Sequence, residues 1–417
     1  MMFQLNGQKF VNSPYSRFGL GMIEPTASFR SAGMGGVSIA LRDNVSVTYS
    51  NPASYSSFDT ISFVFDLGLD YSSNQLKSST AKHTSDDFNF DHIIISFPIK
   101  NKWGFAFGVV PFSNGYYNMG TTITELDPLY DPVVGIVNVE HRGNGGYTRT
   151  FFGTGLALTK NLSVGINMNV LFGEINRTNG YYFESDPVLF SSRYEENISL
   201  SGIYFDGGLQ YHRLLKDKKF LNLGLAYTPK HEFSSDYSNL FLRESLYNLP
   251  PYSPDTVSIV DIPEGSTTLP QTISVGVAYG LTDKFTASVD YVFTDWQNAK
   301  IYGAEDYLTS THSIQAGAEY IPNKFSNLYF FDRIEYRLGG RISENYLTIN
   351  NEQIKEYGIT FGVGIPLGRA VWSKLNIVFD YTNRGGSLTN GLHKENIYSL
   401  GLSFNLYDYW FVKRKYD

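Results

Sequence analysis

Alternation of apolar residues with small or polar ones limits the fold of this chain more than any other feature. Alternating stretches occur at 61–71, 161–173, 285–294, 375–381 and 398–406. Neighbouring side chains of a β-strand point to opposite faces, so each stretch is predicted to be a strand with one apolar and one polar face. The chain between Asp59 and the C-terminus is therefore expected to be all-β.

The apolar face is too large and too aromatic to be the inside of a soluble sandwich. The chain has 31 Tyr, 31 Phe and 39 Gly, and its charged residues amount to only 18%. Aromatic, glycine-rich strands whose hydrophobicity alternates are typical of outer-membrane barrels. No uninterrupted apolar run approaches the roughly 20 residues of a spanning helix. We predict strands whose apolar face meets a bilayer and whose polar face lines a wet interior.

The connections predict a closed barrel of about fourteen antiparallel strands. Short turns are expected at 100–102, 159–161, 216–218, 282–284, 322–324 and 367–369. Longer polar loops are expected near 72–86, 113–145, 174–196, 229–269, 295–308, 342–353 and 383–394. Short turns at one end and long loops at the other, with an even strand number, fit an outer-membrane barrel, and closure removes unpaired edges. The alternative fold is a soluble propeller, although no motif repeats at a fixed period.

The segment 29–59 departs from this pattern, and we expect no regular helix or strand in it. It contains the glycines Gly33, Gly35 and Gly36 and the tripeptide Asn51-Pro52-Ala53. Pro52 lacks an N–H and biases Asn51 away from helical geometry, which indicates a turn. We predict a hatch folded into the lumen, with residues 1–59 as hatch, 60–408 as barrel and 409–417 as a short tail.

These motifs resemble the hatch of the FadL-type outer-membrane transporters for hydrophobic compounds. Members of that family typically carry an arginine- and glycine-rich segment, here Arg30 with Gly33, Gly35 and Gly36, followed by Asn51-Pro52-Ala53. The upstream stretch 13–21 is similar to a subgroup whose mature form starts close to such a motif. The resemblance implies fourteen strands, a lumenal hatch and a kink in the third strand that opens the wall sideways.

A proline in the predicted third strand matches that kink in position. Proline removes a ladder hydrogen bond and is confined to edges or bulges. Pro111, with Ser113 and Gly115, is therefore our candidate for a lateral opening. The alternative is that the membrane span ends at Pro111. The hatch also has two interpretations, a ligand path or a plug that braces the barrel.

No residue pattern indicates an enzyme, a cofactor or a metal site. The chain has no Cys, which excludes thiolate ligands and disulfides, and no pair among its seven His has zinc-ligand spacing. No Gly-x-Ser-x-Gly motif occurs. The carboxylates on the polar face indicate a hydrated lumen, with a cation path as the alternative: Asp66, Asp70, Asp206, Asp290, Glu319 and Asp380.

The ends of the chain carry less information. Residues 1–8 do not have the basic start and apolar stretch of a signal peptide, so we expect a mature or truncated form; the alternative is a protein that stays inside the cell. The aromatic residues near the C-terminus indicate a membrane-interface girdle followed by a basic tail: Tyr407, Tyr409, Trp410 and Phe411. A docking segment is the alternative for that tail.

The best function hypothesis is passive uptake of hydrophobic, fatty-acid-like molecules across the outer membrane of a Gram-negative bacterium. Expected partners are membrane lipids, lipopolysaccharide and a hydrophobic ligand such as a fatty acid or detergent. A net charge of −7 argues against nucleic acid. The alternative is an accessory barrel in an outer-membrane secretion or assembly complex, bound to other outer-membrane or periplasmic proteins. A general porin is a third hypothesis, which a plug opposes.

Overall fold

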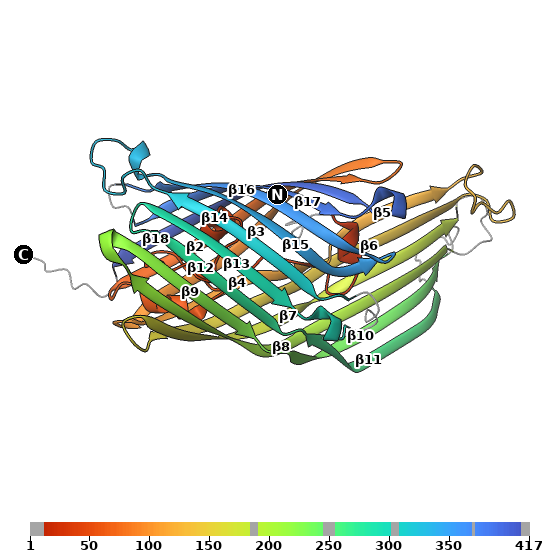
Figure 1. The fold of residues 1–417 in the computed structure, drawn as a ribbon. Helices are drawn as coiled ribbons and strands as arrows, with labels where there is room; N and C mark the ends of the chain where they lie inside the picture. The colour runs from red at the N-terminus through yellow and green to blue at the C-terminus, as the bar shows by residue number, and fades with distance from the viewer. Residues whose placement is uncertain (1–11, 184–190, 245–254, 302–307, 369–371, 410–417) are drawn as a thin grey trace, which may run out of the picture.

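A computed structural model describes residues 12–183, 191–244, 255–301, 308–368 and 372–409 of the chain. The strands form one antiparallel sheet that curls into a barrel (Figure 1). Their bounds are β1 Met22–Ile23, β2 Ser62–Lys77, β3 Lys82–Lys100, β4 Trp103–Asn114, β5 Tyr117–Ile123, β6 Val137–Ala157, β7 Leu162–Phe183, β8 Ser191–Leu214, β9 Lys219–Thr228, β10 His231–Glu244, β11 Asp255–Leu269, β12 Thr272–Leu281, β13 Phe285–Thr294, β14 Thr311–Tyr320, β15 Glu335–Ile349, β16 Glu352–Pro366, β17 Lys374–Gly385 and β18 Lys394–Tyr409.

The wall of the barrel consists of fourteen strands, as the sequence predicts. Of the eighteen strands in the sheet, β1 belongs to the N-terminal segment and not to the wall. Three further pairs each form the two halves of one interrupted wall strand: β4 with β5, β9 with β10, and β11 with β12. The sheet closes because β18 pairs with β2 over its whole length, from Lys394↔Lys77 to Tyr409↔Ser62. A closed antiparallel ring is not a propeller, so that alternative was wrong.

Strands such as β7 and β13 carry apolar side chains on the outside of the barrel and polar ones on the inside. In β7, Ile166 is 50% exposed, whereas the neighbouring Asn167 is 1% exposed. In β13, Val289 is 53% exposed and Asp290 is fully buried. This arrangement is the reverse of a soluble sandwich and matches a wall that faces hydrocarbon.

Four short turns lie where the sequence predicts them, at 100–102, 159–161, 216–218 and 282–284. The tight turn expected at 322–324 was wrong, because residues 321–334 form a longer connection that contains η6. The turn expected at 367–369 lies partly outside the described residues, and the long loops were wrong in extent. Most of the polar residues assigned to loops continue the strands as paired hairpins; β15 and β16, for example, are joined only by Asn350 and Asn351, both with positive φ. A tilted strand needs only about 9–11 residues to cross a bilayer, whereas β8 has 24. Beyond the bilayer the outer face of the strands no longer contacts hydrocarbon. The alternation of apolar and polar residues therefore fades, while the backbone pairing continues.

Residues 12–58 fill the interior of the barrel (the red segment in Figure 1). They include short helical turns, which corrects the expectation of none between residues 29 and 59. The helical elements of the described residues are η1 Pro14–Arg17, α1 Phe29–Ala32, η2 Pro52–Ser57, η3 Lys216–Lys218, η4 Trp296–Asn298, η6 Phe331–Arg333 and η7 Leu388–Asn390. None of the helices in these ranges is long and apolar enough to span a membrane. The residues beyond Tyr409, including Trp410 and Phe411, and residues 1–11 lie outside the described ranges.

Inward glycines of the wall let η2 approach the strands. A Cβ built on Gly208 of β8 would lie 2.0 Å from Oδ1 of Asn51, and one on Gly165 of β7 would lie 2.3 Å from the carbonyl carbon of Pro52. The adjacent Gly207 points outward, and the nearest atom to its Cβ is the carbonyl oxygen of Gly165 at 3.9 Å. The absence of inward side chains at 165 and 208 therefore shapes the seat of η2.

This difference between neighbouring glycines gives a direct test. Gly208→Val forces a side chain into Asn51 and is expected to destabilise the protein by about 1–3 kcal/mol, the usual cost of overpacking. Gly207→Val places the same side chain outside and is the matched control. Equilibrium unfolding in lipid vesicles measures both variants. Equal stabilities would contradict the seating of η2 against the wall.

Candidate functional site

The third strand of the wall separates from its neighbour part of the way along the barrel. β3 and β4 pair from Lys100↔Trp103 to Ile93↔Val109, where the ladder ends. β4 and then β5 continue beyond Val109, paired with β6 on their other side. The separation between β3 and β4–β5 is referred to below as the slit.

The three residues expected at a lateral opening lie at this slit. Pro111 pairs with Thr148 of β6, and the register shifts by one residue between Pro111 and Ser113, so that β4 bulges there. Ser113 is 2% exposed, and the amide of Gly115 donates to the carbonyl oxygen of Gly145 at 2.9 Å. Their part in opening the wall remains a prediction, as does the alternative that the membrane span ends at Pro111.

The N-terminal segment 12–24 occupies the edge of β4–β5 that faces the slit. Met22 and Ile23 of β1 pair antiparallel with Asn114 and Ser113. The amide of Glu24 donates to the carbonyl oxygen of Phe112 at 2.9 Å. These bonds satisfy backbone groups of β4 that β3 does not pair with at this level.

Further along the same edge, side chains of this segment take part. The amide of Asn118 donates to Oδ1 of Asn12 at 2.9 Å, and Nδ2 of Asn12 donates back to the carbonyl oxygen of Asn118 at 3.2 Å. The hydroxyl of Ser16 donates to the carbonyl oxygen of Tyr116 at 2.7 Å. Side-chain as well as backbone hydrogen bonds therefore attach the N-terminal segment to β5 and to the residues between β4 and β5.

Behind the slit lies an apolar cluster formed by the N-terminal segment and the wall. Tyr15, Leu20 and Met22 of the segment pack among inward side chains of many strands, and Phe18, Ile23 and Phe112 extend the cluster to the slit. Its other buried members are Tyr147, Leu171, Ile175, Leu200, Tyr204, Phe233, Leu269, Trp296, Ala299, Ile301, Leu308, Tyr346, Leu347, Ile354 and Leu392. Apolar side chains therefore pack continuously inside the barrel from the long hairpins to the slit.

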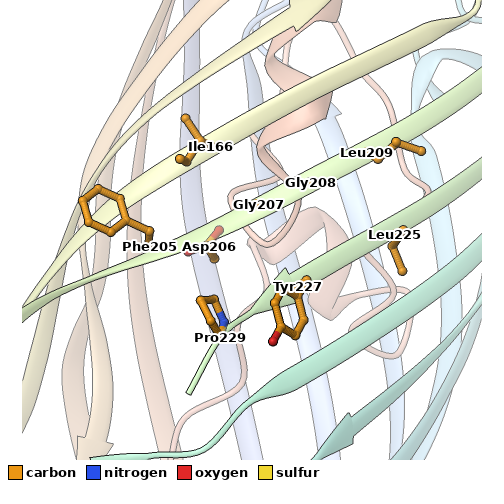
Figure 2. Close-up of a pocket in the computed structure, with 9 residues that line it drawn as sticks. All are labelled: Ile166, Phe205, Asp206, Gly207, Gly208, Leu209, Leu225, Tyr227 and Pro229. Carbon is orange, nitrogen blue, oxygen red and sulfur yellow. The ribbon is translucent and has the colours of Figure 1, made fainter. Parts of the chain in front are cut away.

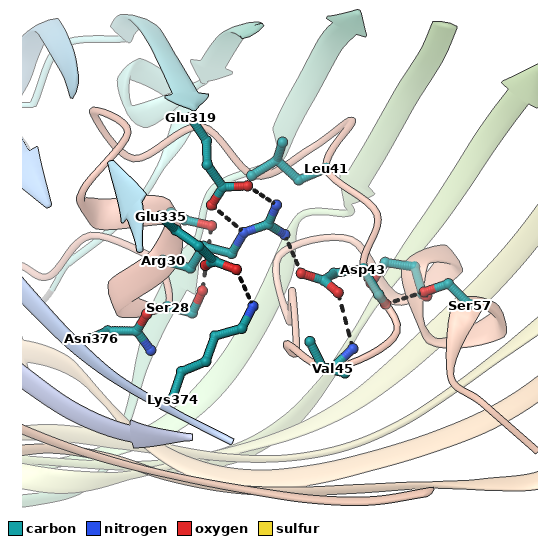
Figure 3. Close-up of polar contacts among 12 residues, drawn as sticks. Ser28, Arg30, Leu41, Asp43, Val45, Ser57, Glu319, Glu335, Lys374 and Asn376 are labelled. Carbon is teal, nitrogen blue, oxygen red and sulfur yellow. Dashed lines mark hydrogen bonds and ion pairs between the residues drawn. The ribbon is translucent and has the colours of Figure 1, made fainter. Parts of the chain in front are cut away.

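The glycine-rich part of the hatch is fixed by buried charges (Figure 3). Both oxygens of the Glu319 carboxylate in β14 accept from the Arg30 guanidinium of α1, at 2.7 and 3.0 Å. Arg337 of β15 also donates to Glu319, at 2.7 Å, and pairs with Glu335, which in turn pairs with Lys374. Glu319 is 4% exposed and Arg337 is 1% exposed, so these charges depend on one another for compensation.

Arg30 also connects α1 to the next part of the hatch. Its Nη1 lies 2.7 Å from Oδ2 of Asp43. Burial alone would raise the pKa of Asp43, but Arg30, and after it Lys374, hold this pKa below the usual value. Asp43 is therefore ionised and helps to bind the guanidinium. A single arginine thus joins two parts of the hatch to the wall.

The expected glycines serve the same docking. Gly35 and Gly36 have positive φ, 76° and 92°, as a sharp turn requires. Gly33 has helical geometry as the C-cap of α1, and its Cβ would lie 3.2 Å from Cα of Gly362 in β16. All three thus bring the backbone of the hatch close to the wall.

Asn51 holds the Asn-Pro-Ala turn in place. Its Oδ1 accepts from the amide of Ala53 at 3.2 Å, which starts η2 at Pro52. Its Nδ2 donates to the carbonyl oxygen of Ile39 at 2.7 Å, with longer contacts of 3.4 Å to those of Leu209 and Leu225. The structure therefore brings the two hatch motifs, Arg30 to Gly36 and Asn51-Pro52-Ala53, into one part of the hatch, called the docked unit below. It is separate from segment 12–24, which is called the slit segment.

Sequence reasoning missed the wall residues that receive the hatch. Asp290 was expected to face a hydrated lumen, yet its Oδ2 accepts from the amides of Ser38 and Ile39 at 2.5 and 2.8 Å. Glu319 was interpreted in the same way, and Arg337 was not considered. The positions of Asp290 and Glu319 on the polar face were visible in the alternation, but their partners in the hatch lie 251 to 289 residues earlier in the chain.

These features define an outer-membrane-type β-barrel with an N-terminal hatch docked inside it. The chain belongs to the BamG family, whose sequence model matches residues 1–417. No curated protein sequence matches it.

Solved structures confirm the resemblance to FadL-type barrels at the level of the fold. The Pseudomonas putida toluene transporter TodX is 14% identical, with a TM-score of 0.61, and the match covers 93% of this chain and 99% of that one. The Ralstonia pickettii toluene transporter TbuX is 15% identical, with a TM-score of 0.58 and coverage of 93% and 98%. A Pseudomonas aeruginosa FadL homologue is 13% identical, with a TM-score of 0.56 and coverage of 93% and 98%.

The carboxylate at the centre of the hatch can be tested by removing its charge. Glu319→Gln leaves Arg30 and Arg337 without their shared counterion and is expected to cost roughly 3–5 kcal/mol of stability. Glu140→Gln is the matched control, since its partner Arg142 has a side chain 60% exposed and such surface pairs contribute about 0–1 kcal/mol. Equilibrium unfolding in vesicles compares the two variants, and a loss at Glu319 no larger than at Glu140 would contradict the anchoring role.

Glu24 makes the attachment of the slit segment sensitive to pH. Burial raises its pKa from 4.5 to about 7, with Arg384 opposing the shift and Asp91 adding to it. The protonated form is favoured in the folded state, so the stability it provides is complete below about pH 4.5 and is lost as the pH rises to about 7. Glu24→Gln should remove this loss. Melting temperatures of both proteins from pH 4 to pH 8 measure it, and parallel curves would contradict it.

Proposed function

We propose that this barrel lets hydrophobic small molecules cross the outer membrane of a Gram-negative bacterium by passive diffusion, leaving sideways through the slit. The single observation that supports this most is the end of the β3–β4 ladder at Ile93 and Val109, with the segment 12–24 lying on the exposed edge. A slit at membrane depth gives a ligand access to hydrocarbon without a passage through water. A non-enzymatic role follows from the same proposal.

The proposed route begins at the long hairpins, where ligand partitions from outside onto apolar side chains. It continues through the apolar cluster, in which Phe18, Ile23 and Phe112 lie nearest to the slit. Each CH₂ removed from water contributes about 0.8 kcal/mol, which is sufficient for capture without a charged partner. Release of segment 12–24 from Phe112, Ser113 and Asn114 then opens the exit.

In this proposal the hatch has two parts with different roles. The docked unit, with Arg30, Gly33, Gly35, Gly36 and Asn51-Pro52-Ala53, closes the lumen toward the short turns and keeps it from acting as an aqueous pore. The slit segment is the movable part, because neutral hydrogen bonds and apolar contacts attach it to β4–β5 whereas buried ion pairs hold Arg30. We keep residues 1–59 as the hatch and 60–408 as the barrel within this proposal.

The ligand class is proposed from the lining and from proteins of the same fold. TodX and TbuX are toluene transporters and CymD is a monoaromatic hydrocarbon channel. The apolar cluster presents aromatic side chains such as Tyr15, Trp296 and Tyr346, which suit aromatic as well as aliphatic ligands. Fatty acids and detergents remain in the proposed ligand class. The surrounding lipid and lipopolysaccharide are the proposed membrane partners.

A second candidate function is that of an accessory barrel in an outer-membrane protein complex. The observation that favours it is the packing of the lumen: Glu319, Arg337 and Asp290 are 4%, 1% and 0% exposed against the hatch. A barrel braced in this way suits a scaffold that does not need to open. Native purification with mass spectrometry distinguishes the two functions, since bound apolar compounds favour transport and companion proteins in fixed ratio favour a scaffold.

The exit can be locked by a disulfide, because the chain has no native cysteine. Ile23→Cys and Ser113→Cys place thiols on register partners of β1 and β4, so that a disulfide fixes segment 12–24 to the edge of the slit. Under oxidation, uptake of radiolabelled toluene or oleate into cells should fall to the level of cells without the protein, and a reductant should restore it. Val277→Cys with Val289→Cys, an outward register pair of β12 and β13, is the control. Unchanged uptake in the oxidised slit variant would contradict the route.

A further inference from the structure

The wall is interrupted a second time, on β8. This strand pairs with β10 from Ser191 to Ser201 and with β9 from Gly207 to Leu214. The two ladders are separated by residues 202–206 of β8 and by the passage from β9 to β10, where Pro229 has no N–H to donate. The first half of this interrupted strand ends at Thr228 and the second begins at His231.

A pocket of about 390 Å³ lies at this interruption (Figure 2). Apolar side chains of β7, β8 and β9, and of the residue that follows β9, line it: Ile166, Phe205, Leu209, Leu225, Tyr227 and Pro229. Gly207 lies among them on the outward side, with no atom closer than 3.9 Å to the position of its Cβ. The pocket therefore results from the missing side chain at Gly207 and from the interrupted pairing of β8 with β9 and β10.

The pocket opens to the membrane side and is separated from the lumen by polar groups. Its lining side chains Ile166, Phe205, Leu209, Leu225 and Tyr227 are 39–50% exposed on the outer face. Asp206 points the other way in Figure 2, and its carboxylate accepts from Nδ2 of Asn167 and of Asn169 at 2.8 and 2.5 Å. An apolar ligand therefore reaches this pocket from the bilayer and not through the hatch.

We propose that this pocket binds one acyl chain of a bilayer lipid. The occupant follows from continuity: the outward residues of β12, such as Ile273, Val275 and Val277, extend the same apolar surface beyond β9. The volume falls within the range of small-molecule pockets, about 300–1,000 Å³. The acyl chain passes from the hydrocarbon of the bilayer into an apolar pocket, so no apolar surface is removed from water. Its binding therefore comes from shape and van der Waals packing and not from the hydrophobic effect. The site is independent of the slit and of the proposed transport.

Lys230 gives this lipid a polar contact at the rim. It follows Pro229 directly, is exposed, and its ammonium donates to the carbonyl oxygen of Asn298 at 3.2 Å. Ammonium groups at a membrane interface attract anionic lipid. A phosphate-bearing lipid whose chain descends from Tyr227 toward Leu225 would place its headgroup at this residue.

Photo-crosslinking tests the proposal on the full chain. The protein is reconstituted in phosphatidylglycerol vesicles that contain a lipid with one diazirine-labelled acyl chain, and adducts are located by mass spectrometry. Leu338 of β15 and Ile359 of β16 also point outward and are more exposed, at 60% and 63%, than Leu209, Leu225 and Tyr227. Labelling at the three pocket residues should nevertheless exceed that at Leu338 and Ile359 by about five-fold, a preference equivalent to about 1 kcal/mol. Equal labelling of both sets would overturn the proposal.

Filling the pocket provides the decisive variant. Gly207→Leu should reduce labelling of the pocket to the level of Leu338, while Ala316→Leu, an outward substitution on β14, should leave it unchanged. Leu209→Trp fills the same space should Gly207→Leu fail to assemble. Labelling that persists in the filled variants would overturn the site. Loss of lipid labelling on addition of free toluene or oleate would reassign the pocket to a free compound, and would also overturn the proposal.

Discussion

The structure depends on the neutralisation of charge inside a ring of strands, beside the apolar cluster that the N-terminal segment forms with the wall. Glu319 is the centre of this neutralisation, because its carboxylate accepts from Arg30 of the hatch and from Arg337 of the wall. A buried charge without a partner costs several kcal/mol. Removal of the hatch would leave Asp290 of β13 without the amides of Ser38 and Ile39, and Glu319 of β14 without Arg30. The inward carboxylates of the wall therefore require the hatch as their hydrogen-bond and ion-pair partner.

The same constraint separates the hatch into two mechanical parts. The docked unit is bound by charge-assisted bonds, which are about twice as strong as neutral ones. The slit segment is bound to β4–β5 chiefly by backbone bonds and by apolar contacts, with Glu24 near the carboxylate of Asp91. A hatch that moves only at its N-terminal segment can expose the slit while the lumen stays closed to water and ions. This division reconciles a braced plug with a sideways route.

Much of the fold could be predicted because its determinants are local. The period of two in segments such as 161–173 assigns the outward and inward faces, and short turns such as 282–284 mark one end of the barrel. The hairpin lengths could not be predicted, since the polar extension of β15 and β16 past the bilayer resembles a loop in sequence. The hatch contacts could not be predicted either: Arg30 and Glu319 are 289 residues apart, and no local pattern identifies that pair. The family resemblance identified Pro111 as a candidate. The bulge beside it is visible only in the structure, as a shift in the register between β4 and β6.

Hydrogen–deuterium exchange of the full chain in lipid nanodiscs tests the central claim most directly. The account predicts that amides at 13–24 exchange much faster than those at 33–39, which are docked by Arg30, Glu319 and Asp290, while the barrel strands remain protected. Glu319→Gln should raise exchange at 33–39 toward the rate of the slit segment. Exchange of both parts at one common rate, in the wild type and in the variant, would contradict a hatch with a fixed unit and a movable segment.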